Sequence, residues 1–118
     1  MLDSDKIKMN FQKAIKDAED LENLAVRLDN VAKVQMEDSL DRARGAWKGT
    51  NADLFIGKTR QIQDDLKILA DKVRKEANGI RTKAQEVYDT EMRNYEIAMK
   101  RISDIKNVIG SVFSKPEH

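Results

Sequence analysis

The feature that most constrains the fold is a pair of long apolar patterns with helical spacing. From Ser4 to Arg44 apolar side chains recur every three or four residues, and neither proline nor glycine interrupts the run before Gly45. This spacing places the side chains on one face of an α-helix. The run predicts a helix over about residues 4–44, about 60 Å long, with Ser4 as its N-cap. Its apolar members are Ile7, Phe11, Ala14, Ala18, Leu21, Leu24, Leu28 and Val31.

A second run predicts a longer helix over about residues 51–113, followed by a short tail over 114–118. Thr50 is its expected N-cap, with Asp53 reaching back in a capping box. Gly79 is a weak point that costs about 1 kcal/mol relative to alanine, and Gly110 and Pro116 mark the far end. The first part of the apolar pattern comprises Ile62, Leu66, Leu69, Val73, Ala77, Ile80, Ala84 and Val87.

Residues 45–50, which contain the only tryptophan, separate the two runs and predict a turn. When the two patterns are laid antiparallel, Leu28 faces Leu69 and Leu24 faces Val73, and the residue numbers of each pair add to 97. Half of that sum falls between Lys48 and Gly49, inside the predicted turn. The sequence therefore predicts an all-α antiparallel helical hairpin that occupies residues 1–118 as a single domain.

Composition agrees with long helices packed along narrow seams. Of the 118 residues, 36% are charged and only six are aromatic, which is too little for a thick globular core.

A net charge of +1 gives no electrostatic reason to expect nucleic acid as a partner. No apolar run approaches the roughly 20 residues that span a bilayer, so stable membrane insertion is not expected. The N-terminus lacks a Sec-type signal pattern, which predicts a protein folded in the cytoplasm.

The second helix is expected to extend beyond the first. In the predicted register Ile7 meets Glu91, and residues from about Met92 to Phe113 have no counterpart. This overhang carries an apolar stripe whose burial would contribute roughly 10 kcal/mol as an upper bound. We therefore expect a partner chain to cover it, and we expect Lys6 or Lys8 to neutralise Glu91 at the junction. The stripe comprises Tyr95, Ala98, Ile102, Ile105, Ile109 and Val112.

Nothing in the sequence predicts an enzyme. The only histidine is His118, the last residue, so a histidine general base has no neighbours to position it. Acidic residues are interspersed with Lys and Arg, as on a solvated helix face. There is no cysteine, no glycine-rich phosphate loop and no set of residues with metal-ligand spacing. We expect no catalytic residues, no metal and no cofactor.

The triplet Trp47-Lys48-Gly49, between two long helices, resembles the Trp-x-Gly turn of the WXG family of type VII secretion proteins. Ala52 and Phe55 match the small and aromatic positions that begin the second helix in that family. The resemblance implies hairpins that pair into four-helix bundles, as homodimers or as heterodimers with a WXG- or LXG-type protein. It also implies that Trp47 and Gly49 form one half of an export cue that a secretion ATPase recognises.

The family's second cue is a Tyr-x-x-x-Asp/Glu motif after the second helix, and this sequence departs from it. Tyr88 and Tyr95 are each followed four residues later by methionine. Phe113 with Glu117 is the nearest match, similar to the Phe-led version in small proteins that accompany LXG toxins, although Pro116 would disturb a helical presentation. The alternative is that Phe113 is simply the last apolar residue of the stripe.

The resemblance implies a chaperone or targeting factor that is cytoplasmic before export and secreted by a type VII system, alone or with an LXG toxin. The alternative is a cytosolic structural coiled coil or adaptor with no secretion role. Trp47 also has two interpretations: its ring closes the core at the turn, or it is exposed there and contacts another protein. The sequence leaves both alternatives open.

Overall fold

The computed structural model describes residues 3–114, and almost all of them are helical. Helix α1 spans Ser4–Asn30, a π-helical turn η1 spans Val31–Gln35, and α2 spans Met36–Ala46. These three elements form one rod. After the turn at residues 47–49, α3 spans Thr50–Ser114 without interruption. The prediction of an all-α fold is confirmed.

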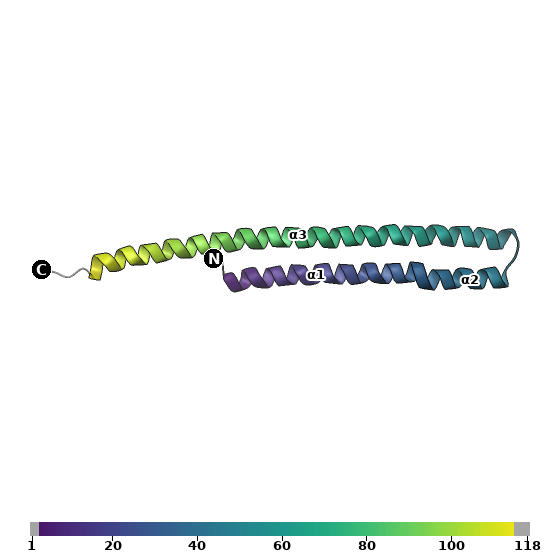
Figure 1. Ribbon diagram of the computed structural model, residues 1–118, viewed down its shortest axis with the longest axis horizontal. Helices are drawn as coiled ribbons and strands as arrows, with labels where there is room; N and C mark the ends of the chain where they lie inside the picture. Colours follow the sequence, from purple (N-terminus) through teal and green to yellow (C-terminus); the bar gives the residue numbers. More distant parts are fainter. Residues whose placement is uncertain (1–2, 115–118) are drawn as a thin grey trace.

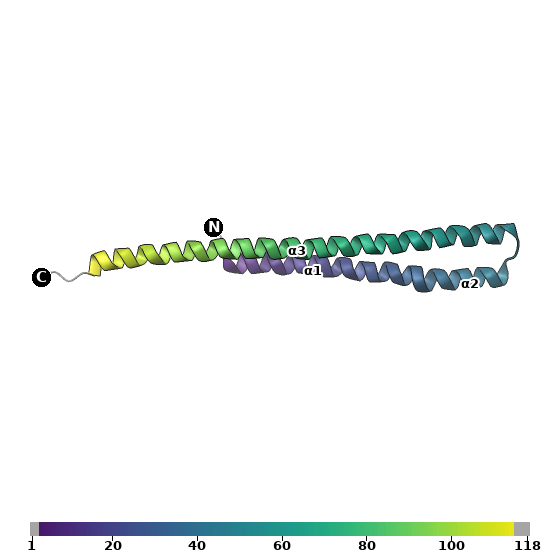
Figure 2. The ribbon, with the colours of Figure 1, turned by 45° about the horizontal axis from the view of Figure 1, so that its top comes forward.

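The two rods lie side by side and antiparallel, and the chain reverses at one end of the molecule (Figure 1). Both views show that α1 ends beside α3 past the midpoint of α3, so that the C-terminal part of α3 projects alone (Figure 2). The molecule measures 107 × 15 × 14 Å, two helices wide at most. This arrangement agrees with the predicted hairpin and its overhang.

Both N-caps lie one residue earlier than predicted. The N-cap of α1 is Asp3, whose carboxylate accepts a 3.0 Å hydrogen bond from the backbone N–H of Asp5. The first backbone bond of α3 runs from the Asp53 N–H to the Gly49 carbonyl, which makes Gly49 its N-cap. Thr50 is therefore already helical.

The first rod was expected to be one regular helix, but it contains η1. From α1 into η1, buried side chains recur at intervals of seven, at Ala18, Ala25 and Ala32, and the next one is Leu40, eight residues on. A π-turn accommodates one additional residue. It brings Leu40 into the contact with α3 in place of the polar Ser39, which is exposed and bonds to the Gln35 carbonyl.

Alanine forms the contact between the rods, where leucine was expected. Ala25 and Ala70 are fully buried, whereas Leu24 and Leu69 are 39% and 46% exposed. Small side chains allow the helix axes to approach closely, and the larger aliphatic residues then lie at the margins of the contact. The Ala32–Gln63 contact shows that the register differs by two residues from the predicted one. The fully buried alanines are Ala18, Ala25, Ala32, Ala70 and Ala77.

Candidate partner-binding surface

The turn presents an aromatic pair to solvent. Trp47 is 54% exposed, and its ring meets that of Phe55 edge-on, with centroids 5.2 Å apart. Gly49 has φ of +102°, a conformation that side chains disfavour, and this angle directs the chain into α3. Ala52 is buried behind the turn. Trp47 is therefore not a plug in the core of this chain, although its ring packs on Phe55.

One edge of the hairpin is closed by ion pairs between the rods. Arg81 pairs with Glu22, Arg74 with Asp29, and Arg60 with Glu37 at 2.8 Å. The hydrogen bond from the Arg74 guanidinium holds the pKa of the Asp29 carboxyl below its usual value, and the same bond raises the pKa of Arg74. Each of these arginines lies on α3, so α3 supplies the positive side of this edge.

A buried glutamine links the two rods next to η1. The Gln63 amide donates to the Ala32 carbonyl at 2.6 Å and to the Glu37 carboxylate at 2.9 Å, and its own oxygen accepts from Arg60. The hydrogen bond from Gln63, and after it that from Arg60, lowers the pKa of Glu37. Gln63 is only 3% exposed, and each of its polar atoms is satisfied.

The opposite edge of the hairpin is apolar and uncovered. Ala70 marks the centre of the contact on α3. Measured around the helix axis from Ala70, the three arginines lie about 20–80° to one side, and the aliphatic side chains of α3 lie about 40–100° to the other side. On the first rod, likewise, Glu22 and Asp29 lie on the opposite side of Ala25 from the leucines. We call this edge the open face. It comprises Leu21, Leu24, Leu28, Val31, Ile62, Leu66, Leu69, Val73, Ile80 and Val87.

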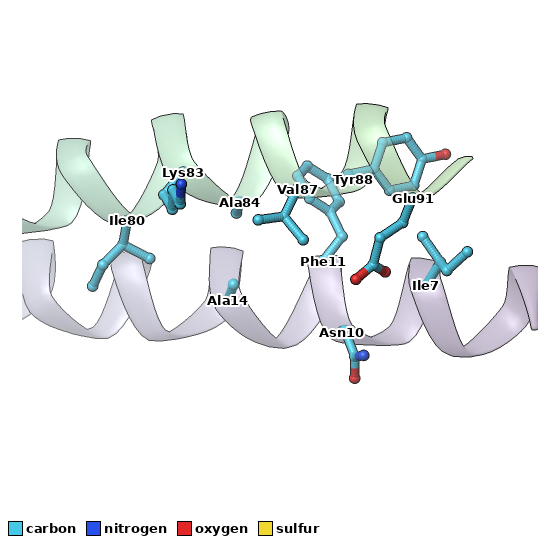
Figure 3. A pocket seen from close by; sticks show the side chains of 10 residues that line it. All are labelled: Ile7, Asn10, Phe11, Ala14, Ile80, Lys83, Ala84, Val87, Tyr88 and Glu91. Atoms are coloured by element: carbon cyan, nitrogen blue, oxygen red, sulfur yellow. The ribbon is translucent and has the colours of Figure 1, made fainter. Parts of the chain in front are cut away.

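Near the N-terminal end of α1 the open face deepens into a groove of about 310 Å³. The rings of Phe11 and Tyr88 pack against each other at its wall in a tilted arrangement, with ring centroids 4.9 Å apart. In Figure 3 the Glu91 carboxylate lies between Phe11 and Ile7, at the end of the paired region. The expected neutralisation of Glu91 by Lys6 or Lys8 is absent, because no ion pair within residues 3–114 involves Glu91. The groove is lined by Ile7, Asn10, Phe11, Ala14, Ile80, Lys83, Ala84, Val87, Tyr88 and Glu91.

Beyond Glu91 the overhang, residues 92–114, continues as a single helix of about 35 Å. The residues of α3 that are buried against α1 lie seven positions apart, at Gln63, Ala70 and Ala77. In the predicted stripe, from Tyr95 to Val112, the residues Ala98, Ile105 and Val112 continue this spacing. The stripe therefore extends the face of α3 that contacts α1 in the hairpin. Ile105, Ile109 and Val112 are each at least half exposed.

The two predicted halves of the export cue lie at opposite ends of α3. Trp47 and Gly49 form the turn, whereas Phe113 is in the last helical turn of the overhang and is 84% exposed. Glu117, its proposed companion, and Pro116 lie outside the described residues. The geometry thus separates the turn motif from Phe113 by nearly the whole length of the molecule (Figure 1).

Residues 3–114 contain no cluster of three or more His, Cys, Asp or Glu side chains that could hold a metal ion. None of the helices in the same residues combines the length and the apolarity that crossing a bilayer requires.

The sequence predicted the stripe and the turn but not the ion-paired edge or the role of Gln63. The signal for the edge was present in the spacing of Glu22 and Asp29, seven residues apart like Arg74 and Arg81.

No protein-family model, curated protein or solved structure matches this chain significantly. The resemblance to the WXG family accordingly rests on the Trp47-Lys48-Gly49 turn, on Ala52 and Phe55, and on the hairpin architecture.

Proposed function

We propose that the chain is a non-enzymatic, WXG-like subunit of type VII secretion that binds other helices. In this proposal its hairpin pairs into a four-helix bundle, either with a second copy or with a WXG- or LXG-type partner. It acts as a chaperone or targeting factor, and the paired form is presented to the secretion ATPase. The protein is cytoplasmic before export.

The observation that carries the proposal is the open face. A two-helix hairpin whose contact is made mainly by alanines buries little apolar surface, and aliphatic side chains such as Leu24, Ile62 and Leu69 remain about 40–50% exposed. Contiguous exposed apolar surface of this kind is typical of protein interfaces. A second hairpin laid on the open face would complete a four-helix core.

Two features of the turn support the secretion role. Trp47 stands exposed beside Phe55, where another protein can contact both rings, and tryptophan is enriched among residues that dominate binding energy. The positive φ of Gly49 fixes the backbone conformation of the turn that carries Trp47. The Trp-x-Gly triplet therefore lies at an accessible position at one end of the molecule.

Pairing is tested by light scattering of the purified chain, alone and after co-expression with a candidate WXG- or LXG-type partner. Leu24→Asp combined with Leu69→Asp should abolish the paired form, because two charges would enter its core. Val26→Asp combined with Ile68→Asp is the matched control, since both residues are exposed but lie off the open face. A chain that stays monomeric and binds no such partner would contradict the proposal.

The secretion role is tested separately by export. Trp47→Ala should block export while circular dichroism and the oligomeric state remain unchanged, because the ring is more than half exposed. Unchanged export of a folded Trp47→Ala variant would favour the cytosolic adaptor alternative.

A further inference from the structure

We infer that the overhang stripe binds an amphipathic helix of another protein whose flanking positions are acidic, and that it does not bind a second copy of itself. The inference rests on the proposed helix-binding role and names the chemistry of the partner. Its evidence is the distribution of charge around the stripe.

The stripe has the spacing of a coiled-coil seam. Its six residues, Tyr95 to Val112, are separated by three, four, three, four and three positions, which correspond to alternating a and d positions of a heptad. In such a seam the neighbouring e and g positions face the partner helix and select it by charge. Here those positions are occupied by Asn94, Met99, Arg101, Lys106, Val108 and Phe113.

The charged flanks are both positive. Arg101 lies on one side of the stripe and Lys106 on the other, each about 70° from its centre, and both are exposed. The acidic residues of the overhang, Glu96 and Asp104, lie about 130–150° away on the back of the helix. Within residues 3–114 neither Arg101 nor Lys106 forms an ion pair.

Self-pairing of two overhangs offers neither cation an acidic partner, because no e or g position of the stripe carries Asp or Glu. In a parallel pair Arg101 faces Lys106, which is repulsive. In an antiparallel pair with the two stripes opposite each other, Arg101 lies near Val108 and Lys106 lies near Met99 of the second copy, which leaves both cations unpaired. A helix with glutamate or aspartate at its flanks would pair with both cations.

The hairpin itself already uses this pairing. Along its closed edge, Arg60, Arg74 and Arg81 of α3 each pair with an acidic residue on the neighbouring rod. An acidic helix on the overhang would extend the same chemistry beyond the end of α1, in contact with the stripe that α1 does not reach.

The test uses the full chain and synthetic helical peptides about three heptads long. The peptides share Ile and Leu at the seam positions and carry glutamate, glutamine or lysine at the flanks. Calorimetry should show that the glutamate peptide binds at least about tenfold more tightly than the lysine peptide at low salt, with a smaller preference at high salt. Ile105→Asp should abolish binding, whereas Leu69→Asp, on the hairpin, should not.

Charge reversal supplies the matched pair of variants. Arg101→Glu with Lys106→Glu should reverse the preference, so that the lysine peptide binds more tightly. Arg93→Glu with Lys100→Glu makes the same change in net charge on the back of the helix, about 150–170° around the helix axis from the stripe. This double variant should keep the preference for the glutamate peptide.

Three results would overturn the inference: no peptide binds, the lysine peptide binds as tightly as the glutamate peptide, or both double variants change the preference equally. Self-association that Ile105→Asp removes would also overturn it, by assigning the stripe to a second copy. Pairing of hairpins through the open face is measured independently with the Leu24 and Leu69 variants. The proposed function can therefore survive failure of this inference, and the reverse also holds.

Discussion

The side-chain amide of Gln63 on α3 donates a 2.6 Å hydrogen bond to the main-chain carbonyl of Ala32, within the π-helical turn of the opposite rod. The bond joins an irregular point of one rod to a buried side chain of the other. Because Gln63 also donates to Glu37 and accepts from Arg60, both polar atoms of its buried side-chain amide have partners.

Gln63→Leu should lower the free energy of unfolding by about 1–3 kcal/mol, because it leaves the Ala32 carbonyl without its donor inside the contact. Urea unfolding followed by circular dichroism measures the change. Gln61→Leu is the control, since Gln61 is exposed two positions away on α3, and it should change stability by less than about 0.5 kcal/mol. Equal effects of the two substitutions would contradict the role of the bond.

Ala25→Leu should destabilise the hairpin by about 1–3 kcal/mol, since Ala25 is fully buried between the rods and a larger side chain would push them apart. Asn23→Leu, at an exposed position of the same helix, should be near neutral. If Ala25→Leu stabilised the protein instead, the close alanine contact would be wrong.

Gly49→Ala should cost about 1–3 kcal/mol, because the backbone at this position has φ of +102°. Gly45→Ala should act in the opposite direction and stabilise α2 by about 0.5–1 kcal/mol, since Gly45 is helical and an added Cβ meets no neighbouring atom. Thermal unfolding measures the stability of both variants. If both substitutions changed the stability in the same direction, the backbone conformation described for Gly49 and Gly45 would be wrong.

Stability should fall in acid partly through Asp29. Its pKa is lowered in the folded chain by the hydrogen bond from Arg74, so its contribution is fully present above the ordinary value of 3.8 and is lost as the pH falls through the lower folded value. Unfolding free energies of the wild type and Asp29→Asn, measured from neutral pH to below pH 3.8, should therefore differ most at neutral pH and converge in acid.

Asp64→Asn is the control for that series, because Asp64 is exposed and forms no ion pair within residues 3–114. It should retain the acid dependence of the wild type. A constant difference between the wild type and Asp29→Asn across the whole pH range would show that the Arg74 pair does not contribute through protonation.

The all-helical fold and the place of the turn were predictable because both depend on local signals. The three- and four-residue spacing defines helices wherever glycine and proline are absent, and the only stretch rich in glycine lies between the two runs. The predicted reversal between Lys48 and Gly49 falls inside the observed turn at residues 47–49.

The register and the π-helical turn were not predicted, because they depend on which face of a broad apolar stripe makes the contact. Leucine dominates the stripe by hydrophobicity, and this favoured a Leu28–Leu69 pairing. The structure instead buries Ala25 and Ala70, since small residues permit closer approach and ion pairs can then form along one edge. The spacing of eight residues between Ala32 and Leu40 was the available sign of η1.

The short turn also dictates an order of assembly. Contacting residues beside the turn at 47–49 are close in the sequence, whereas Ile7 and Glu91 are more than eighty residues apart. The entropic cost of bringing two residues together therefore increases with distance from the turn. Contacts between the rods should therefore form first at Ala43 and Ala52, beside the turn, and last at Phe11 and Tyr88, in the groove. They should break in the reverse order. The end where α1 leaves α3 is consequently the first place where an incoming helix can replace α1 without unfolding the turn.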